Sequence, residues 1–226
     1  GLHERALSTV ELKREVRAGN LGLVRTWTGD EARPGNFSGT IGYEDGRFGF
    51  GYRFGGHGHV EVPRSPALHL DRFTLAAWVK TIGDVPHHYA IFAKENHHCG
   101  APWNHRNFYL GISPKFIHGG IGVTFFAPGA RIGAKADVAD GKWHHIALSY
   151  DGTEAKMYVD AKEIAKGPVA RPPVDDRQEL WLGAYGRASR PLQARMNMDD
   201  AAVFDHALSS QEIALLANPE GETARK

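Results

Sequence analysis

Hydrophobic residues recur along the chain in short alternating runs, and clusters of Gly, Pro, Asp and Asn separate these runs. Phe73, Leu75, Ala77 and Val79 alternate with other residues, so they share one face of a strand. From residue 21 onward this spacing is typical of a β-sandwich or a β-barrel, and no strand–helix alternation appears. The predicted strands cover residues 23–27, 48–54, 59–63, 73–80, 89–94, 107–112, 120–126, 143–150, 155–160, 180–184 and 196–204.

Two tight turns are predicted in the second half of the chain. Asp151 and Gly152 form a favoured hairpin dipeptide between the strands at 143–150 and 155–160. The next turn contains Ala161, where a tight hairpin favours glycine because the backbone needs a positive φ. We therefore expect an unusual backbone at Ala161.

Two segments that resemble each other are predicted to begin short helices near the N- and C-termini. Ser8 with Glu11, and Ser209 with Glu212, have the spacing of a capping box, and Ala-Leu-Ser occurs in both copies. A common cap motif can recur by coincidence; alternatively, residues 1–20 are the tail of a preceding module of the same kind. The sandwich is then expected over residues 21–218, with a polar tail at 219–226.

Composition narrows the class of protein. The chain has 226 residues, of which 42% are apolar, so one domain with a sizeable core is expected. A net charge of +1 gives no field for nucleic acid, and no apolar stretch is long enough to insert into a membrane. The 13 His residues would make the molecule cationic below about pH 6, which favours an acidic glycan. Cys99 is the sole cysteine, so no internal disulfide forms.

Several ordered motifs together resemble the laminin-G-like jelly-roll domains of the concanavalin A-like lectin/glucanase superfamily. The resemblance runs from about residue 22 to 217, nearly the whole chain. It is carried by YRFGG at 52–56, HVEVP at 59–63, FTLAAWVK at 73–80, DGKWHHIALSYDG at 140–152, MYVD at 157–160 and MDDAAVF at 198–204.

The resemblance implies two stacked antiparallel sheets, carbohydrate or protein ligands, and often a structural Ca²⁺. It also implies a secreted, periplasmic or cell-surface protein, although no signal sequence is present in the chain. Enzymes, lectins and adhesion modules share this architecture, so the resemblance implies no single activity. We expect a monomeric module within a multidomain chain.

Calcium needs oxygen ligands from several segments, and Asp199, Asp200 and Asp30 are the candidates. Regular strand alternation would place Asp199 and Asp200 on opposite faces, so at most one of them would point at a given ion. Asp199 resembles the carboxylate near the metal in related sandwiches, and this resemblance makes it the preferred ligand. Alternatively, these carboxylates accept backbone N–H groups or lie in solvent. Gly55 and Gly58 stand where many family members carry Asp, which favours this second interpretation.

The segment at 95–106 is the most unusual part of the chain, because the family has a shorter loop there. His97, His98, Cys99 and His105 are candidate metal ligands, but their spacing fits no zinc signature, and a polar loop is the simpler interpretation. Trp103 would offer a flat face to a sugar, or would fold back over the sheet edge.

Ligand-binding residues are therefore expected in and next to this segment, where polar groups would bond hydroxyl or acid groups of a sugar. His144 and His145 belong to a strand motif and are expected to be structural, as are Trp78, Trp143 and Trp181. The candidate ligand-binding residues are Trp103, Asn104, His105, Arg106, Tyr109, His97 and His98.

No catalytic residue is assigned. Retaining glycosidases need two carboxylates close together, and the pair at 199–200 is not expected to meet that requirement. A polysaccharide lyase needs only a base and a cation, for which His105, Arg106, Tyr109 and Lys94 are candidates. The sequence thus predicts a carbohydrate-binding, lectin-like module. The alternatives are a lyase or hydrolase acting on an acidic polysaccharide, and a protein-binding adhesion or structural module.

Overall fold

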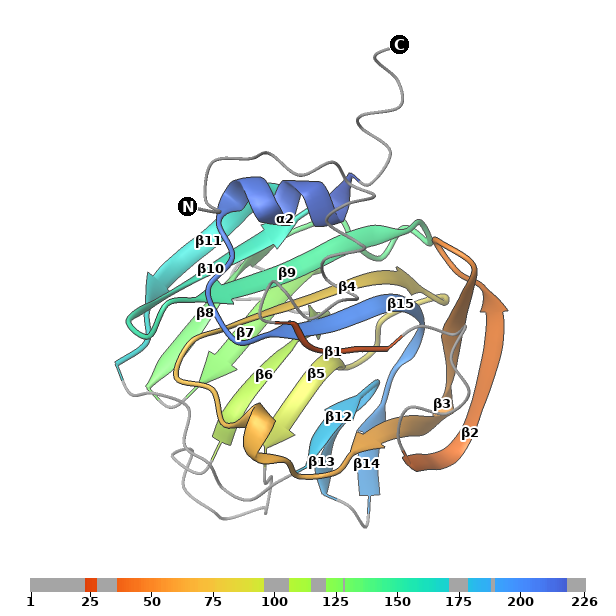
Figure 1. Ribbon diagram of the computed structural model, residues 1–226. Helices are drawn as coiled ribbons and strands as arrows, with labels where there is room; N and C mark the ends of the chain where they lie inside the picture. Colours follow the sequence, from red (N-terminus) through yellow and green to blue (C-terminus); the bar gives the residue numbers. More distant parts are fainter. Residues whose placement is uncertain are drawn as a thin grey trace.

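The computed structural model describes residues 23–27, 36–95, 106–114, 121–127, 129–170, 179–187 and 190–218. Within these residues the chain is almost entirely antiparallel β-strand, with one α-helix near the C-terminus (Figure 1). No helix among them is long and apolar enough to cross a membrane. The strands are β1 (Leu23–Trp27), β2 (Asn36–Asp45), β3 (Phe50–Val62), β4 (Phe73–Thr81), β5 (Tyr89–Glu95), β6 (Arg106–Ser113), β7 (Gly122–Ala127), β8 (Ala130–Lys135), β9 (His144–Tyr150), β10 (Glu154–Val159), β11 (Lys162–Pro168), β12 (Leu180–Leu182), β13 (Ala184–Arg187), β14 (Arg190–Gln193) and β15 (Arg195–Phe204).

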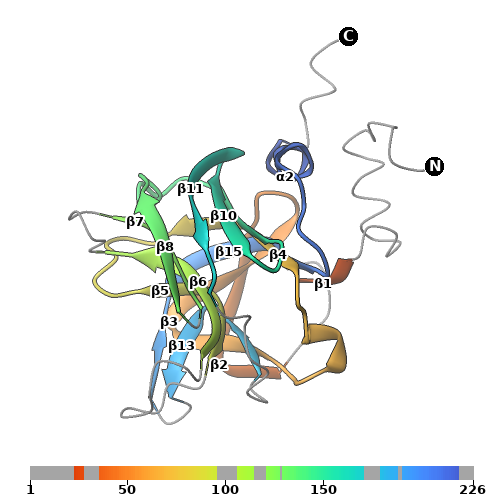
Figure 2. The same ribbon diagram turned by 90° about the vertical axis from the view of Figure 1, so that its left-hand side faces the viewer.

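Thirteen strands form one curled sheet rather than two separate ones. Their order is β11-β10-β9-β4-β15-β3-β12-β5-β6-β7-β8, with β1 paired to β15 and β2 paired to β3. The sheet folds over so that β11 comes to lie beside β8 and the barrel-like shell is nearly closed (Figure 2). The expected all-β jelly-roll architecture is confirmed, but its two layers are continuous through hydrogen-bonded strands.

The β2–β3 hairpin connects the two layers. The first half of β3 pairs with β15, from Tyr52 to Gly55, and its second half pairs with β12, from Val60 to Val62. β2 follows this bend through a register shift between Gly39 and Ile41. The sequence predicts two strands, at 48–54 and 59–63, where the structure has one long strand, because the glycines between them bend the backbone without ending the pairing.

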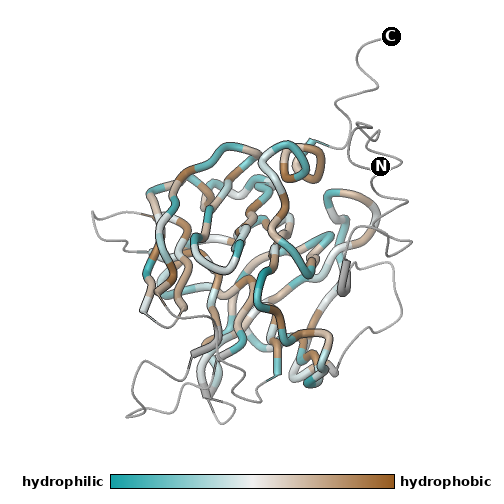
Figure 3. The backbone as a smooth tube through the Cα atoms, turned by 60° about the vertical axis from the view of Figure 1, so that its left-hand side comes forward, coloured by the Kyte–Doolittle hydropathy of each residue, from teal (hydrophilic) through white to brown (hydrophobic). Residues whose placement is uncertain are grey.

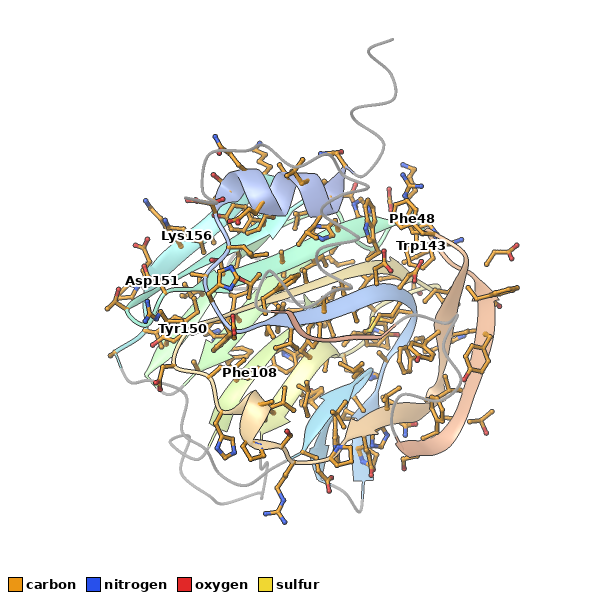
Figure 4. All side chains as sticks on the ribbon, viewed as in Figure 1. Phe48, Phe108, Trp143, Tyr150, Asp151 and Lys156 are labelled. Carbon is orange, nitrogen blue, oxygen red and sulfur yellow. The ribbon has the colours of Figure 1, made fainter. Side chains whose placement is uncertain are left out.

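The core lies between the layers. Phe73 of β4 lies 5.0 Å from Phe108 of β6 and 5.3 Å from Tyr150 of β9, measured between ring centroids. Both partner side chains are labelled in Figure 4. Hydrophobic and hydrophilic positions alternate along the backbone (Figure 3), as expected for strands with one buried face.

The helix α2 (Ser210–Ala217) covers the outer face of β4, β9, β10 and β15. Ile213 of the helix and Leu208 before it pack there against Tyr158 and Phe204. Ser209 and Glu212 form the expected capping box, in which the Ser209 backbone N–H donates to the Glu212 carboxylate at 2.7 Å. The matching motif at Ser8 lies outside the described residues.

Most predicted strands are present, and the Asp151–Gly152 hairpin is confirmed between β9 and β10. Ala161 has φ 67° and its neighbour Asp160 has φ 50°, so the expected unusual turn is confirmed. The strands β2, β8, β11, β13 and β14 were not predicted. They are rich in glycine or polar residues, so hydrophobic alternation does not identify them.

Candidate functional site

A row of register partners crosses the outer face of the layer that contains β12 and β5 to β8. Each residue is paired with the next across neighbouring strands, and alternation places all six on the face away from the core. The row, which we call the cross-strand row, consists of Glu61, Trp181, Ala93, Tyr109, Phe126 and Arg131.

The centre of the row is aromatic. Tyr109 lies 5.6 Å from Phe126 and 5.3 Å from Tyr185 of β13, between ring centroids. The ring of His88 lies edge-on to all three, at 6.3 to 6.4 Å. Phe126, Tyr185 and His88 are half-buried, whereas Tyr109 is only 2% exposed. The cluster therefore presents the edges of Phe126, Tyr185 and His88 to the surroundings, packed against a buried Tyr109.

Small and hydroxyl-bearing residues form the floor beside the row on β6 and β7. Gly111 is required there because a Cβ atom at this position would overlap the phenol of Tyr109, which lies over it. Thr124 pairs with Gly111, and Ser113 lies two residues further along β6 on the same face. The hydroxyls of Thr124 and Ser113 are fully buried and have no hydrogen-bond partner among the residues that the structure describes. Such groups are few in native proteins, and a ligand or water commonly satisfies them.

One end of the row is acidic. The ring of His59 packs at 4.5 Å against Trp181, and its Nε2 lies 3.0 Å from the Glu61 carboxylate. Glu179 accepts a hydrogen bond from the indole N–H of Trp181 at 3.4 Å. Trp181, which was expected to be structural, is half-buried on the outer face of the sheet and not in the core between the layers. Strand alternation explains this, because Leu180 and Leu182 on either side of it point inward.

His59 is neutral in this setting. It is 2% exposed, and burial lowers the pKa of its imidazole although Glu61 and Glu179 oppose that effect. A neutral ring that donates from Nε2 to Glu61 accepts at Nδ1, where the Gln193 amide lies 3.5 Å away. A neutral His59 does not cancel the negative charge of the Glu61 carboxylate at this end of the row.

The β13–β14 hairpin lies against the same face and fixes its edge. It forms a separate two-stranded sheet after β12. His87 approaches the backbone carbonyl of Gln193 at 3.1 Å, and because a carbonyl only accepts, Nε2 of His87 carries the hydrogen. The hairpin thereby holds Gln193 beside His59 and Tyr185 beside Tyr109.

The other end of the row is cationic. The guanidinium carbon of Arg131 lies 5.2 Å from the centroid of Phe126, within the range of a cation–π contact. Lys135 lies on the same face of β8, opposite Gly122, and both cationic side chains are exposed. The row therefore runs from carboxylates on one side, over aromatic rings, to cations on the other.

The two ends of the predicted ligand-binding segment are described by the structure, and they lie next to this face. Glu95 and Arg106 pair where β5 and β6 begin to diverge, close to the Ala93–Tyr109 pair of the row. Of the predicted ligand-binding residues, Tyr109 is placed in the row. The side chain of Arg106 and the residues Trp103, Asn104, His105, His97 and His98 lie outside the described residues, so their roles stay predictions.

The predicted calcium ligands do not form a ligand set within the described residues. Asp199 is fully buried, and its two oxygens accept the backbone N–H groups of Phe48 and Asp200 at 2.8 Å each. Asp200 has φ 45° in a bulge of β15, so regular alternation does not apply to this pair. Asp30 lies outside the described residues. Across the described ranges, no three His, Cys, Asp or Glu side chains are grouped to hold an ion.

The histidines of β9 have structural surroundings, as expected. His145 is 2% exposed beside Trp78, and burial lowers its pKa to about 4. Burial alone would also lower the pKa of His144, but hydrogen bonds to Asp160 at 2.8 Å and Asp140 at 3.0 Å outweigh it and raise the pKa. His144 therefore links two turns through its contacts with the carboxylates of Asp140 and Asp160.

Sequence reasoning missed Phe126, Tyr185, His88 and Arg131 as parts of one surface. The available signal was a pair of adjacent aromatic residues in a strand, such as Phe125 and Phe126, because alternation must send one of them outward. The register that brings these residues into one row is set by tertiary pairing and is not visible in the sequence. His59 lies in β3, as the strand predicted at 59–63 indicates, and His57 belongs to the same strand.

Solved structures share this fold at low sequence identity. Domain 4 of AbnA, an extracellular GH43 arabinanase from Geobacillus stearothermophilus, in complex with arabinotriose, matches with TM-score 0.65 and 18% identity, covering 86% of this chain and 98% of that one. A botulinum neurotoxin type C structure, described with two ganglioside molecules in cell entry, matches with TM-score 0.67 and 14% identity over 90% of this chain. The binding domain of Paraclostridial Mosquitocidal Protein 1 matches with TM-score 0.66 and 13% identity over 87% of this chain.

The chain spans about half of each of these two toxin chains, 52% in both cases. No curated relative matches it in sequence. The Laminin_G_3 family model matches residues 54–214, which include every strand of the cross-strand row. The curled antiparallel shell, its closing helix and this match over most of the chain agree: the protein belongs to the Laminin_G_3 family of the concanavalin A-like lectin/glucanases superfamily.

Proposed function

We propose that this domain is a carbohydrate-binding module whose glycan ligand lies along the cross-strand row. The observation that carries the proposal is the register itself, which aligns the half-buried Trp181 and Phe126 on one face between polar ends, with Tyr109 buried between them as support. Aromatic rings offer apolar faces to sugar rings, and polar groups beside them fix orientation. Three strand steps separate Trp181 from Phe126, roughly 14 Å, which suits an oligosaccharide rather than a single sugar.

Structural neighbours support the carbohydrate class. The arabinanase domain is described in complex with arabinotriose, and neurotoxin domains of this fold are described with gangliosides and a sialylated ligand. These neighbours are parts of larger proteins, and the arabinanase is extracellular. We therefore propose a secreted or cell-surface protein in which this domain supplies affinity for a glycan.

Trp103 and its neighbours extend the proposal. The ends of their segment enter beside the Ala93–Tyr109 pair. We propose that these side chains, which lie outside the described residues, contact the same ligand.

Binding to immobilised oligosaccharide arrays, followed by titration calorimetry, tests the function. Phe126→Ala should weaken the measured affinity about tenfold, because burying an aromatic ring contributes about 1.5 kcal/mol or more. Phe50→Ala is the matched control, since Phe50 is 55% exposed on β3 and is not in the row. Thermal unfolding of both variants establishes that each is folded.

The outcomes separate the three classes of function. Loss of affinity in Phe126→Ala but not in Phe50→Ala supports the carbohydrate module. The appearance of ultraviolet absorbance from unsaturated products would favour a polysaccharide lyase instead. If no glycan binds the wild-type domain, the protein-binding or structural module becomes the better account.

A further inference from the structure

We propose, building on the proposed function, that the site selects a glycan carrying a carboxylate group, and that this group binds at the β8 end of the row. The inference rests on the opposite charges at the two ends of one aromatic surface. It names a ligand class and a direction of binding that the fold does not imply.

The cationic end is placed to receive the anion. Arg131 packs over Phe126, so a sugar ring lying against Phe126 would bring its substituents next to the guanidinium. Arginine binds carboxylates through two parallel N–H groups, and such charge-assisted bonds are stronger than neutral ones. Lys135, exposed on the same face of β8, adds a second positive charge.

The acidic end of the row repels the carboxylate of the glycan, and this repulsion sets the direction in which the glycan lies along the row. Glu61 bonds to a neutral His59, so its negative charge is not cancelled there. Glu179 lies next to Trp181 and adds a second carboxylate. A like charge placed near these groups is repelled, so a neutral part of the glycan is expected at Trp181.

Two hydroxyl groups in the floor beside the row can form further hydrogen bonds. Thr124 and Ser113 are fully buried hydroxyl residues without a hydrogen-bond partner among the described residues, and alternation places both on this face. Each hydroxyl can both donate and accept, so a bridging water can connect it to a ligand. Both lie toward β8 rather than toward the acidic end.

Paired ligands test this inference: an oligosaccharide that contains a uronic acid, and its carboxyl-reduced counterpart with the same linkages. The wild-type domain should bind the acidic form about tenfold more tightly, and this preference should shrink at high salt. Arg131→Gln should lose most of that preference, because the substitution should weaken binding of the acidic form several times more than binding of the reduced form.

Lys156→Gln is the matched control. Lys156 lies on β10 in the other layer, below α2 in Figure 4, and the substitution removes the same charge. It should leave both affinities unchanged. Because Arg131 is exposed on a strand at the rim of the sheet, both variants are expected to fold, and thermal unfolding verifies this.

Two failures can be told apart. If the wild-type domain binds the acidic and reduced forms equally, or if Arg131→Gln weakens both alike, the charge selection is wrong although the carbohydrate function stands. If neither form nor any other glycan binds, the proposed function itself fails. An equal effect of Lys156→Gln and Arg131→Gln would mean that net charge, not this site, attracts the ligand.

Discussion

The carboxylate of Asp199 on β15 accepts a 2.8 Å hydrogen bond from the backbone N–H of Phe48, 151 positions earlier in the chain. Asp199 also accepts backbone hydrogen bonds from Arg47 and Asp200. It therefore fixes the turn between β2 and β3 to the closing strand. Asp199 therefore has the role given above as the alternative to calcium binding, in which the carboxylate accepts hydrogen bonds from backbone N–H groups.

The first prediction concerns the pH dependence of folding. Burial raises the pKa of Asp199 from 3.8 to about 6, against the opposing backbone hydrogen bonds. The native state therefore takes up a proton that the unfolded state has released between about pH 4 and pH 6. The stability contributed by protonation is complete below pH 4 and is lost as the pH rises through 6.

Asp199→Asn removes this titration. The difference in unfolding free energy, wild type minus variant, should therefore fall by about 2 to 3 kcal/mol from pH 4 to pH 7. Urea unfolding of both proteins at several pH values measures it, and other titrating groups cancel in the difference. A difference that stays constant or rises with pH would contradict the buried, proton-binding carboxylate.

The second prediction concerns the close approach of the β2–β3 turn to Asp199. A Cβ atom at Gly46 would lie 2.5 Å from Oδ2 of Asp199 and 2.9 Å from the backbone nitrogen of Gly51. Gly46→Ala must therefore displace the turn, and we expect a loss of about 1 to 3 kcal/mol in urea unfolding. Gly55→Ala is the control, because a Cβ atom there meets nothing within 4 Å. Equal effects of the two substitutions would refute the close-approach explanation.

The third prediction uses the strained β10–β11 turn. Ala161 has φ 67°, a left-handed conformation that glycine adopts without steric cost. Ala161→Gly should raise the unfolding free energy by about 0.5 to 1 kcal/mol, even though glycine gains entropy in the unfolded chain. Ala170→Gly, at an exposed position outside the strands, should be neutral or destabilising. A lower thermal midpoint for Ala161→Gly would show that the turn changes conformation.

The fourth prediction tests calcium binding, which the sequence suggests. Among the described residues, no three His, Cys, Asp or Glu side chains are grouped to hold an ion. An ion that binds only the native state raises the unfolding midpoint. At a hundredfold excess over its dissociation constant, the ion adds about 2.7 kcal/mol to the free energy of unfolding. If the midpoint is higher in Ca²⁺ than in EDTA, Mg²⁺ has no such effect, and Asp199→Asn abolishes the increase, then Asp199 is a calcium ligand. The same midpoint in EDTA and Ca²⁺ would leave Asp199 with its backbone role alone.

Sequence reasoning identifies the parts of the fold that depend on local pattern. The alternation of Phe73, Leu75, Ala77 and Val79 defines β4, and the Ser209–Glu212 spacing defines the start of α2. Sequence reasoning failed where the backbone conformation interrupts the regular alternation of a strand. The bulge at Asp200 breaks alternation through a positive φ, which no hydrophobic period reveals in an acidic pair.

The candidate site was harder to predict because its residues are joined only by strand pairing. Tyr109 was identified through its proximity in sequence to the 95–106 segment, not through its partners. Trp181 and Phe126 were not identified, since the order of β12, β5, β6 and β7 in the sheet brings them together. Strand order depends on contacts between segments far apart in sequence, which a single sequence does not show.

The position of β12 bears on how the domain assembles during synthesis. β12 comes from residues 180–182, yet it pairs with β3 on one side and β5 on the other. Until these residues have left the ribosome, β3 and β5 each present an unpaired edge that other chains can join. A chain truncated before Leu180 should therefore aggregate, and the aromatic surface should form only when nearly all of the domain has been made.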